Sequence, residues 1–383
     1  MKDDVLIVGG GILGLSVACS LAERADLQVT LLEREPNLGQ GSTAKANGGV
    51  RAQFTTAVNV EFSAYSIARL EELATESGNS FAFHQKGYLL FTADPQRLES
   101  LRRAYDLQRS LGVDTHWLEP DQVAALAPFV RAEGLLGGTI HTRDGFLDPH
   151  GLVSVLAHKA KALGVNVRTS TEVGTIEHSA DGYEIGTNAG KLNAPIVVNA
   201  AGPSAALIGS FVRVDIPVFP LRRNIAFIHD EREPRDLIPM CVDLDTGVLI
   251  RREGRDGYLI AYSDSSDEPG WDSSFDPTWL DAVALRISNR FPHLGDVPIV
   301  RRHCWAGLYP ETPDGHAIIG EVDEVPGFFL CVGFGGHGLM HSPAAGRAIA
   351  ELVVDGACST FDLHPLRLSR FAEGDLIVEQ AVL

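Results

Sequence analysis

The sequence predicts a mixed fold in which an α/β domain with a parallel sheet is interleaved along the chain with an α+β domain built on an antiparallel sheet. Residues 5–33 have the pattern of a strand, a glycine-rich turn, a helix and a second strand, which is a complete βαβ unit. Between residues 215 and 305, short strands are joined by tight turns such as 254–257, which is typical of antiparallel sheet. After Trp305 a buried strand, a glycine run and a helix return, so the two domain types alternate.

The predicted elements follow from apolar runs and their spacing. Residues 5–8 form an apolar run without alternation, which indicates a strand buried on both faces. A helix follows to about Arg24, and a second strand covers 28–32. Apolar periodicity predicts further helices at 60–75, 95–112, 152–163 and 343–354. Further strands are predicted at 87–91, 165–168, 183–187, 195–199, 247–251, 258–262 and 328–332.

Composition excludes several classes of function. The 383 residues are 45% hydrophobic and 21% charged, as in ordinary globular proteins. The net charge of −18 repels phosphate backbones, so we expect no nucleic-acid partner. Five scattered cysteines without a CxxC pair, and histidines without ligand spacing, predict no disulfide framework and no metal site, and favour a cytoplasmic location.

One uncharged stretch, residues 5–22, is long enough to resemble a membrane span or a signal sequence. Acidic residues Asp3 and Asp4 precede it, where a signal sequence has basic ones, and glycines interrupt its middle. We therefore expect neither a membrane span nor a signal sequence here.

The glycine motif at the first turn predicts a dinucleotide site. Gly9, Gly11 and Gly14 have the GxGxxG spacing between a strand and a helix, where glycine allows the tight turn, the approach of a pyrophosphate and close packing. The free N–H groups at the helix start attract phosphate despite the acidic chain. Glu33, at the end of the second strand, is placed to accept ribose hydroxyl groups. This motif alone leaves FAD and NAD open.

A second polar segment, residues 41–49, narrows the choice. Its backbone N–H groups and the hydroxyl of Ser42 or Thr43 could bind phosphate, and Gly48 and Gly49 would let a flat ring lie against the backbone. The alternative is a mobile surface loop.

With these motifs the chain resembles the D-amino acid oxidase superfamily of FAD-dependent oxidoreductases. The resemblance extends over nearly the whole chain, in the order 9–14, 33–34, 41–43, 49–54, 144–150, 198–203, 307–314 and 333–338. It is similar above all to sarcosine oxidase and to the β subunits of sarcosine oxidase and L-proline dehydrogenase. The resemblance implies a Rossmann-like FAD-binding domain of the GR2 type, assembled from residues 1–85, 145–214 and 305–383. It implies a substrate domain with an antiparallel sheet, made of residues 86–144 and 215–304.

The motif and the resemblance together assign a set of residues to FAD. We expect the run 335–340 to lie beside the flavin pyrimidine, where a helix start near Pro343 stabilises negative charge. The expected cofactor residues are Gly9, Gly11, Ile12, Leu13, Gly14, Glu33, Arg34, Gly41, Ser42, Thr43, Lys45, Asn47, Gly48, Gly49, Val50, Val173, Ala201, Gly202, Gly307, Gly333, Gly335, Gly336, His337, Gly338, Leu339 and Met340.

The chain departs from the family pattern at functional positions. Gly307 stands where members with covalent flavin have cysteine, which predicts noncovalent FAD. Leu259 replaces the lysine thought to activate oxygen, which favours a dehydrogenase or a slow oxidase. Met340 and Tyr309 replace a lysine and an arginine that bind substrate carboxylate in relatives. The usual carboxylate-binding cations are therefore missing.

Several side chains are candidates for the substrate side of the site. Arg251 shares a strand face with Leu249, the family's pocket-lining position, so we expect it to bind carboxylate; Arg222, Arg223 and Arg252 are further candidates. The alternative for Arg251 is a cross-strand ion pair. Arg51 and His337 are expected beside the flavin, and Tyr309 and Tyr258 as pocket-lining groups, with core packing as their alternative.

The resemblance implies FAD-dependent oxidation of a secondary or N-methyl amino acid, sarcosine- or proline-like, by hydride transfer to flavin N5. The imine product then hydrolyses, and O2 or another acceptor reoxidises the flavin. Two alternatives remain open: an oxidase of glycine or D-amino acids, and a flavoprotein β subunit of a hetero-oligomeric dehydrogenase. Oligomeric state is not predicted.

Overall fold

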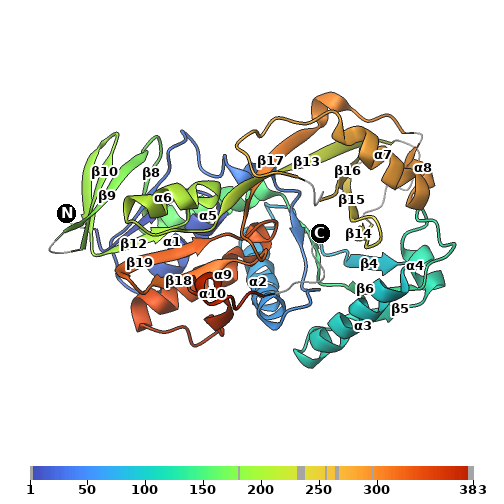
Figure 1. Ribbon diagram of the computed structural model, residues 1–383, viewed down its shortest axis with the longest axis horizontal. Helices are drawn as coiled ribbons and strands as arrows, with labels where there is room; N and C mark the ends of the chain where they lie inside the picture. The colour runs from blue at the N-terminus through green and yellow to red at the C-terminus, as the bar shows by residue number, and fades with distance from the viewer. Residues whose placement is uncertain are drawn as a thin grey trace.

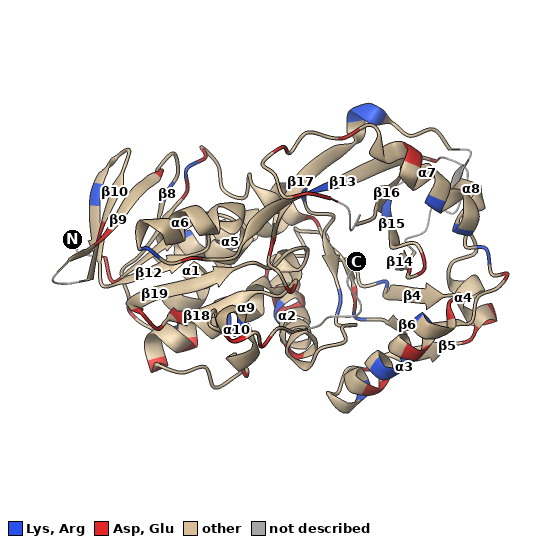
Figure 2. Ribbon diagram, in the orientation of Figure 1, with Lys and Arg blue, Asp and Glu red and all other residues tan. Residues whose placement is uncertain are grey.

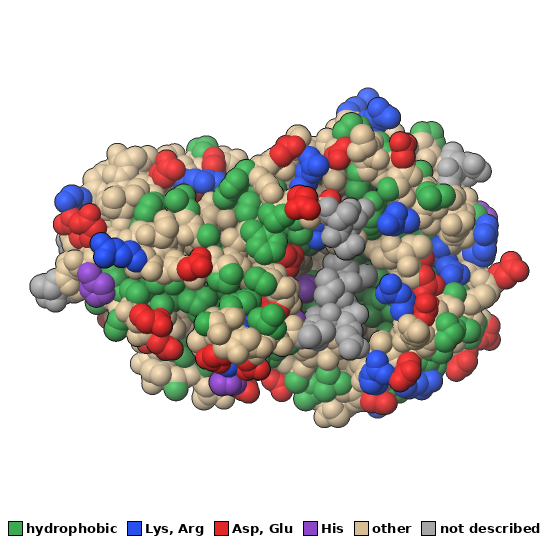
Figure 3. Space-filling view, in the orientation of Figure 1, with side chains coloured by type: hydrophobic (Ala, Val, Ile, Leu, Met, Phe, Trp, Pro, Cys, Tyr) green, Lys and Arg blue, Asp and Glu red, His purple; other side chains and the backbone are tan. Residues whose placement is uncertain are grey.

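The computed structural model describes residues 3–179, 182–230, 238–254, 257–263, 267–295 and 297–377. It has two lobes side by side along the long axis (Figure 1). One lobe is organised around a six-stranded sheet and the other around an eight-stranded sheet. Acidic and basic residues are distributed over both lobes (Figure 2), and charged groups of both signs are interspersed with apolar groups on the visible face (Figure 3). Among the described residues, no helix is long and apolar enough to cross a membrane.

The six-stranded sheet confirms the parallel βαβ start. β1 (Val5–Val8) lies in the middle and pairs in parallel with β2 (Val29–Leu32) and β12 (Ile196–Asn199). The sheet order is β18-β19-β12-β1-β2-β8, so strands from three distant parts of the chain meet. The other strands are β8 (Asn166–Arg168), β18 (Ile318–Val322) and β19 (Val325–Val332).

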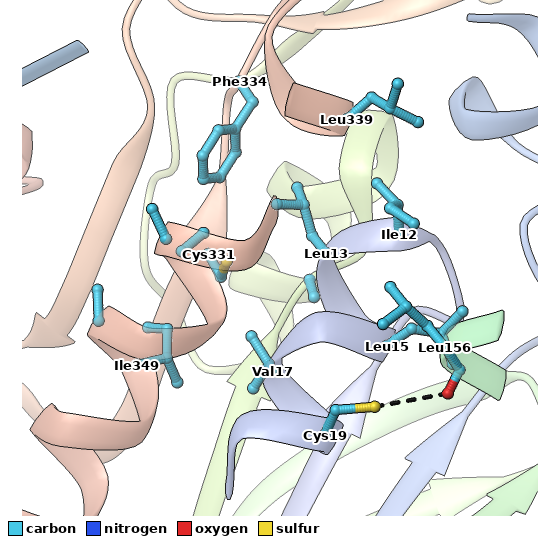
Figure 4. Close-up of a cluster of buried hydrophobic side chains, with 14 of the residues drawn as sticks. Ile12, Leu13, Leu15, Val17, Cys19, Leu156, Cys331, Phe334, Leu339 and Ile349 are labelled. Atoms are coloured by element: carbon cyan, nitrogen blue, oxygen red, sulfur yellow. Dashed lines mark hydrogen bonds between the residues drawn. The ribbon is translucent and has the colours of Figure 1, made fainter. Parts of the chain in front are cut away.

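The two faces of this sheet are covered differently. Ile7 and Val198 belong to a core shared with α1 (Ile12–Arg24), α2 (Ala57–Glu76), α5 (Pro149–Ala162) and α9 (Gly338–Asp355). Figure 4 shows part of it, including the Cys19 thiol donating to the Leu156 carbonyl oxygen at 3.5 Å. Leu6 and Val197 face the other way, toward α6 (Ala205–Phe211) and the sheet of β9 (Val173–Ser179), β10 (Gly182–Thr187) and β11 (Gly190–Ala194). Strand alternation thus gives one core to each face.

The second lobe is an antiparallel sheet apart from one parallel pair. Its order is β17-β13-β16-β15-β14-β4-β6-β5, with β14 and β4 parallel. α7 and α8 pack over one face with α4, and α3 lies on the other side beside β4 and β6. The bounds are β4 (Tyr88–Thr92), β5 (His116–Leu118), β6 (Gly137–His141), β13 (Phe219–His229), β14 (Met240–Asp243), β15 (Val248–Glu253), β16 (Gly257–Ala261), β17 (Trp305–Glu311), α3 (Pro95–Ser110), α4 (Pro120–Leu126), α7 (Trp279–Arg290) and α8 (Pro292–Gly295).

Short elements complete the fold. β3 (Gly49–Val50) and β7 (Gly145–Phe146) form a two-stranded ladder, and α10 (Arg370–Glu373) is a single turn. The 3-10 turns are η1 (Ser42–Lys45), η2 (Gly202–Ser204), η3 (Arg301–His303) and η4 (His364–Leu366).

Two positions differ from the sequence expectation. Residues 305–311, which we assigned to the cofactor domain, form β17 and pair with β13, so this strand belongs to the sheet of the other lobe. Helix α9 begins at Gly338 instead of near Pro343, with the proline inside it. Pro343 cannot donate to the Leu339 carbonyl oxygen, and the Ser342 hydroxyl donates to that oxygen at 3.0 Å instead. The helix therefore continues through a residue that normally ends one.

Candidate active site

The β1–α1 turn leaves no room for side chains at two of its glycines. Gly9 has φ +115°, and a Cβ atom placed on it would lie 2.4 Å from the Ala200 carbonyl oxygen. A Cβ atom on Gly14 would lie 1.9 Å from the Gly9 carbonyl oxygen, so α1 packs directly on the turn. Gly11 differs, because its nearest neighbour would be the Thr43 hydroxyl oxygen at 3.4 Å. The backbone at Gly11 is thus open to a ligand.

The first turn of α1 carries donors for an anion. Gly11 is the N-cap residue of α1, and no side chain of the N-cap accepts a hydrogen bond from the helix. The Ile12 N–H donates to the Thr43 hydroxyl at 3.2 Å. Beside it, Glu33 accepts the Gly10 N–H at 2.8 Å and the Glu35 N–H at 2.8 Å. These bonds fix the carboxylate at the end of β2. An uncapped helix start beside a fixed carboxylate fits the pyrophosphate and ribose of a dinucleotide.

The polar segment 41–49 is anchored to β17 and is not a free surface loop. Ser42 donates to the Leu308 carbonyl oxygen at 2.5 Å, and the Trp305 indole donates to the Lys45 carbonyl oxygen at 3.0 Å. A Cβ atom on Gly307 would lie 2.5 Å from the Lys45 Cβ atom. The segment therefore rests on a strand of the opposite lobe, which holds it at the junction.

The end of this segment is equally constrained. Gly48 has φ +82°, and a Cβ atom on it would lie 2.1 Å from the Leu147 carbonyl oxygen. The Gly49 N–H donates to the Asn47 side-chain oxygen at 2.9 Å, and Val50 pairs with Gly145 in the β3–β7 ladder. A rigid, side-chain-poor strip of backbone results, against which a flat ring can lie.

A cavity lies where the two lobes meet. It unites residues expected on the cofactor side with residues of the antiparallel sheet, including Arg223 and Leu249. Its lining consists of Ser42, Lys45, Ala46, Asn47, Arg51, Tyr88, Arg223, Asn224, Ile225, Gly247, Leu249, Ala261, Tyr262, Ser263, Gly307, Leu308, Tyr309, Gly336, His337 and Met340. Because the lining combines cations and other polar side chains with apolar ones, the cavity suits a small polar ligand.

Comparison with known proteins decides the family. Residues 4–352 match the family model described as FAD dependent oxidoreductase (DAO). The chain belongs to this family. FAD is therefore its cofactor, and the enzyme is an oxidoreductase.

Individual relatives cover the whole chain. FAD-dependent oxidoreductase domain-containing protein 1 of Xenopus laevis is 28% identical, covering 100% of this chain and 85% of that protein. Glycine oxidase of Geobacillus kaustophilus is 28% identical over 96% of this chain and 97% of its own. The crystal structure of L-proline dehydrogenase from P. horikoshii superposes with a TM-score of 0.92 at 27% identity, covering 98% of this chain and 99% of that one.

In this flavoprotein, Arg51 and His337 lie together on the wall of the cavity, Arg51 buried and His337 partly exposed. Arg51 is 2% exposed, bonds the Gln53 carbonyl oxygen and has its guanidinium carbon 3.9 Å from the Phe54 ring centroid. The His337 ring meets Phe54 edge-on at 5.0 Å. Burial, together with the charge of Arg51, lowers the pKa of His337 to about 3. His337 is thus a neutral imidazole at neutral pH, and Arg51 is the cation of this wall.

Helix α9 starts at this wall. His337 is its N-cap without a side-chain cap, and Leu339 and Met340 lie in its first turn. Upstream, Gly335 has φ +49° and donates its N–H to the Pro310 carbonyl oxygen at 2.9 Å, and Gly333 has φ +74°. A Cβ atom on Gly336 would lie 2.7 Å from the Tyr309 ring. The glycine run thus brings the helix start close to Tyr309, and its contact with the flavin stays a prediction.

The remaining expected cofactor residues flank the nucleotide path. Ala201 donates its N–H to the Asn199 side chain at 3.1 Å, and Gly202 has φ +55° with open space around it. Val173 is buried at the start of β9, Arg34 pairs with Glu35 at 3.4 Å on the surface, and Gly41 faces open space. Their contacts with FAD stay predictions.

Arg251 does not line the cavity. Its Nε donates to the Asn47 carbonyl oxygen at 2.6 Å, and its Nη1 donates to the Arg252 carbonyl oxygen at 2.9 Å and pairs with Glu253 at 2.5 Å. Burial lowers the pKa of this guanidinium. Arg251 does share the strand face of Leu249, but Asn47 comes from a distant segment and occupies its donor group. In this structure the side chain links the segment 41–49 to the antiparallel sheet.

Tyr258 does not line the cavity either. It is 1% exposed and lies in the core beneath α7, with the Arg252 guanidinium carbon 4.8 Å from its ring centroid. Tyr258 is therefore a core residue, which was the alternative to a pocket-lining role. Tyr262, four residues further, does reach the cavity, where its other face stacks on Trp279 at 5.1 Å. The strand ends between the two tyrosines, so alternation no longer relates them.

Arg223, one of the further candidates from the sequence, lies on the wall of the cavity. It pairs with Asp267 through Nη1 at 2.6 Å, and the same nitrogen donates to the Arg222 carbonyl oxygen at 3.2 Å. Its guanidinium carbon lies 5.6 Å from the Tyr309 ring centroid. Its Nε is buried and has no hydrogen-bond partner among the described residues. The local sequence does not distinguish Arg223 from Arg222. The two differ in strand register, because Arg223 pairs with Gly307 of β17.

Tyr88 was not foreseen at all. Tyr88 is buried beside Gly49, and a Cβ atom placed on Gly49 would lie 3.0 Å from the Tyr88 hydroxyl oxygen. Burial raises the pKa of the Tyr88 phenol. Its sequence context is an ordinary apolar strand, so no local signal could have assigned it to the cavity.

Proposed function

We propose that this enzyme oxidises a secondary or N-methyl amino acid, sarcosine- or proline-like, at the carbon next to nitrogen. FAD, when bound, supplies the hydride acceptor. The observation that carries the proposal is the unpaired edge of the Arg223 guanidinium in the cavity. Nη1 is engaged by Asp267 and the Arg222 carbonyl, whereas Nε has no partner among the described residues. The Nε–Nη2 edge therefore has no protein partner among the described residues. Because Nε is buried, a substrate carboxylate bound in the two-bond geometry that guanidinium groups favour would reach it only as the surrounding side chains move apart.

The other lining groups fit an amine that reacts as its free base. The pKa of His337 is lowered to about 3, so this imidazole adds no positive charge that would repel a protonated amine on arrival. Leu249, Ile225 and Ala261 supply an apolar wall opposite the helix start of α9. An apolar wall excludes water while the C–H bond is held in line. In the balanced reaction, CH–NH loses a hydride and a proton to become C=N, which water then hydrolyses.

Two relatives support different amines. L-proline dehydrogenase, whose substrate is a secondary amine, superposes over nearly the full length of both chains. Glycine oxidase, whose substrate is a primary amine, is also similar over nearly both full lengths. We place the secondary amine first because the L-proline dehydrogenase structure superposes with a TM-score of 0.92, against 0.84 for the G. kaustophilus glycine oxidase structure.

Anaerobic mixing with sarcosine, L-proline, glycine and D-alanine tests the proposal through bleaching of the flavin absorbance. We expect the fastest bleaching with sarcosine or L-proline. Faster bleaching with glycine or D-alanine would select the primary-amine oxidase, and no bleaching with any of the four would refute amino-acid oxidation.

The same samples address the acceptor and the attachment of the flavin. Comparing turnover with O2 and with an artificial dye distinguishes an oxidase from a dehydrogenase. Size exclusion together with these assays shows whether the chain is active alone or needs partner subunits, as a flavoprotein β subunit would. After denaturation we expect the flavin in the supernatant, because Gly307 offers no thiol and Lys45 fills the space beside it. Flavin that stays with the precipitated protein contradicts noncovalent attachment.

A further inference from the structure

A second cavity lies in the cofactor lobe, on the outer side of its helical layer. It has a volume of about 440 Å³, within the range of small-molecule sites. None of its lining residues borders the cavity between the lobes. It is enclosed by α1, α2, α5 and α9, through Ser16, Cys19, Ser20, Glu23, Arg24, Tyr65, Arg69, Leu70, Leu73, Leu152, Leu156, Lys159, Ser342, Pro343, Arg347 and Ala350.

The lining is positively charged in a chain whose net charge is −18. Four cations border it, Arg24, Arg69, Lys159 and Arg347, against one acid, Glu23. Glu23 pairs with Lys159 at 2.7 Å. The acids that pair with the three arginines, Asp355, Glu72 and Glu351, lie outside the lining. Each cation of the lining thus has an acidic partner, but only one of these acids, Glu23, borders the cavity, which favours an anion as the occupant.

Two buried donors at this cavity have no partner. Ser16 is 4% exposed, and its hydroxyl makes no hydrogen bond among the described residues. The Nε of Arg24 is likewise buried and unpaired, although its Nη2 bonds Asp355. Buried donors are nearly always paired in folded proteins, so an acceptor supplied by a ligand would complete them.

Apart from its charged groups the lining is mixed, with Ser20, Tyr65 and Ser342 beside apolar side chains. Leu70 and Leu73 of α2 and Leu152 and Leu156 of α5 border the same space. We propose that this cavity binds a small organic monoanion with an apolar body, such as a medium-chain carboxylate. Its acidic head lies among the arginines and the Ser16 hydroxyl, and its apolar body lies against the leucines.

The site is connected to the flavin by the helices that form it. α1 begins at the pyrophosphate turn, and α9 begins at His337 on the wall of the other cavity. α5 starts two residues after Leu147, whose N–H donates to the Gly48 carbonyl oxygen at 2.9 Å. A bound ligand that shifts these packed helices would therefore change the surroundings of the cofactor.

Titration calorimetry on the holoenzyme with octanoate tests the inference. Acetate, which has the charge without the apolar body, and 1-octanol, which has the body without the charge, serve as matched probes. We expect octanoate to bind at least about tenfold more tightly than either. Equal binding of octanoate and 1-octanol, or no binding of octanoate, overturns the inference.

Variants locate the site. Arg69→Glu places a second negative charge beside Glu72 at the cavity, and we expect it to weaken octanoate binding by about tenfold or more. Ser16→Ala removes one donor and should weaken binding less. Arg103→Glu is the matched control, because Arg103 has a similar helical pair with Glu99 on α3 in the other lobe. Thermal unfolding of each variant verifies the fold.

Arg223→Met separates this site from the cavity between the lobes. If octanoate binding survives Arg223→Met and is lost in Arg69→Glu, the second cavity is the site. If Arg223→Met abolishes binding and Arg69→Glu does not, octanoate occupies the active site and the inference fails, while the proposed function stands.

Discussion

Replacing Arg223 by methionine removes the guanidinium but keeps a chain of similar length against Tyr309. A substrate carboxylate that loses a desolvated, charge-assisted pair loses about 2–5 kcal/mol of binding. At about 1.4 kcal/mol per factor of ten, kcat/KM for the amino acid should fall by roughly 30- to 4000-fold. The same substrate without its carboxylate, dimethylamine for sarcosine or pyrrolidine for L-proline, should change by less than about threefold, since nothing pairs with the removed group.

Stopped-flow reduction of the flavin under anaerobic conditions measures both substrates on one enzyme. Arg222→Met is the matched control, because Arg222 lies next along β13 but pairs with Asp272 and Asp276 outside the cavity. We expect that control to leave both substrates nearly unchanged. Equal losses for the amino acid and its carboxylate-free amine in Arg223→Met would show that Arg223 supports the cavity without binding the carboxylate, and would refute the assignment.

Three further predictions rest on other parts of the molecule. Arg251→Met should weaken FAD binding by about 1–3 kcal/mol, because it leaves the Asn47 carbonyl oxygen without its donor, and fluorescence of released flavin measures this loss. KM for the amino acid should stay nearly unchanged. Unchanged FAD binding with a raised KM would show that Arg251 binds the carboxylate. Gly14→Ala should abolish FAD retention on a desalting column, since a Cβ atom would lie 1.9 Å from the Gly9 carbonyl oxygen, and retained flavin contradicts this. Burial opposes ionisation of Glu351, but hydrogen bonds from residues 359–360 and Arg347 prevail and lower its pKa to about 2. Its stabilisation is therefore complete above the ordinary pKa of 4.5 and is lost as pH falls toward 2, so Glu351→Gln should lower the free energy of unfolding at pH 7, by a difference that shrinks below pH 4.5 in urea titrations.

The fold of the cofactor lobe followed largely from local patterns. The run 5–8 and the glycines after it lie within one βαβ unit, and the sheet and helix formed where the pattern predicted them. The start of α9 was placed five residues late, since a proline usually ends a helix and the compensating Ser342 hydroxyl bond is not visible in a periodicity. The pairing of β17 with β13 was missed because it joins strands about 80 residues apart, and strand pairing over such distances leaves no local mark.

The sequence by itself determined the dinucleotide turn. Gly9, Gly11, Gly14 and Glu33 lie within 33 residues, so their spacing is sufficient evidence for a dinucleotide site, whereas the choice of FAD needed the resemblance over the whole chain. The choice of Arg223 as the proposed carboxylate-binding cation rests on tertiary structure alone. Arg251 and Arg223 both lie on strands of the same sheet, and strand alternation sets only the face on which each side chain lies. Asn47, 204 residues away, engages Arg251, while Arg223 keeps an unpaired edge beside Tyr309. Which arginine remains available depends on partners that the fold brings from distant segments, and no local pattern records them.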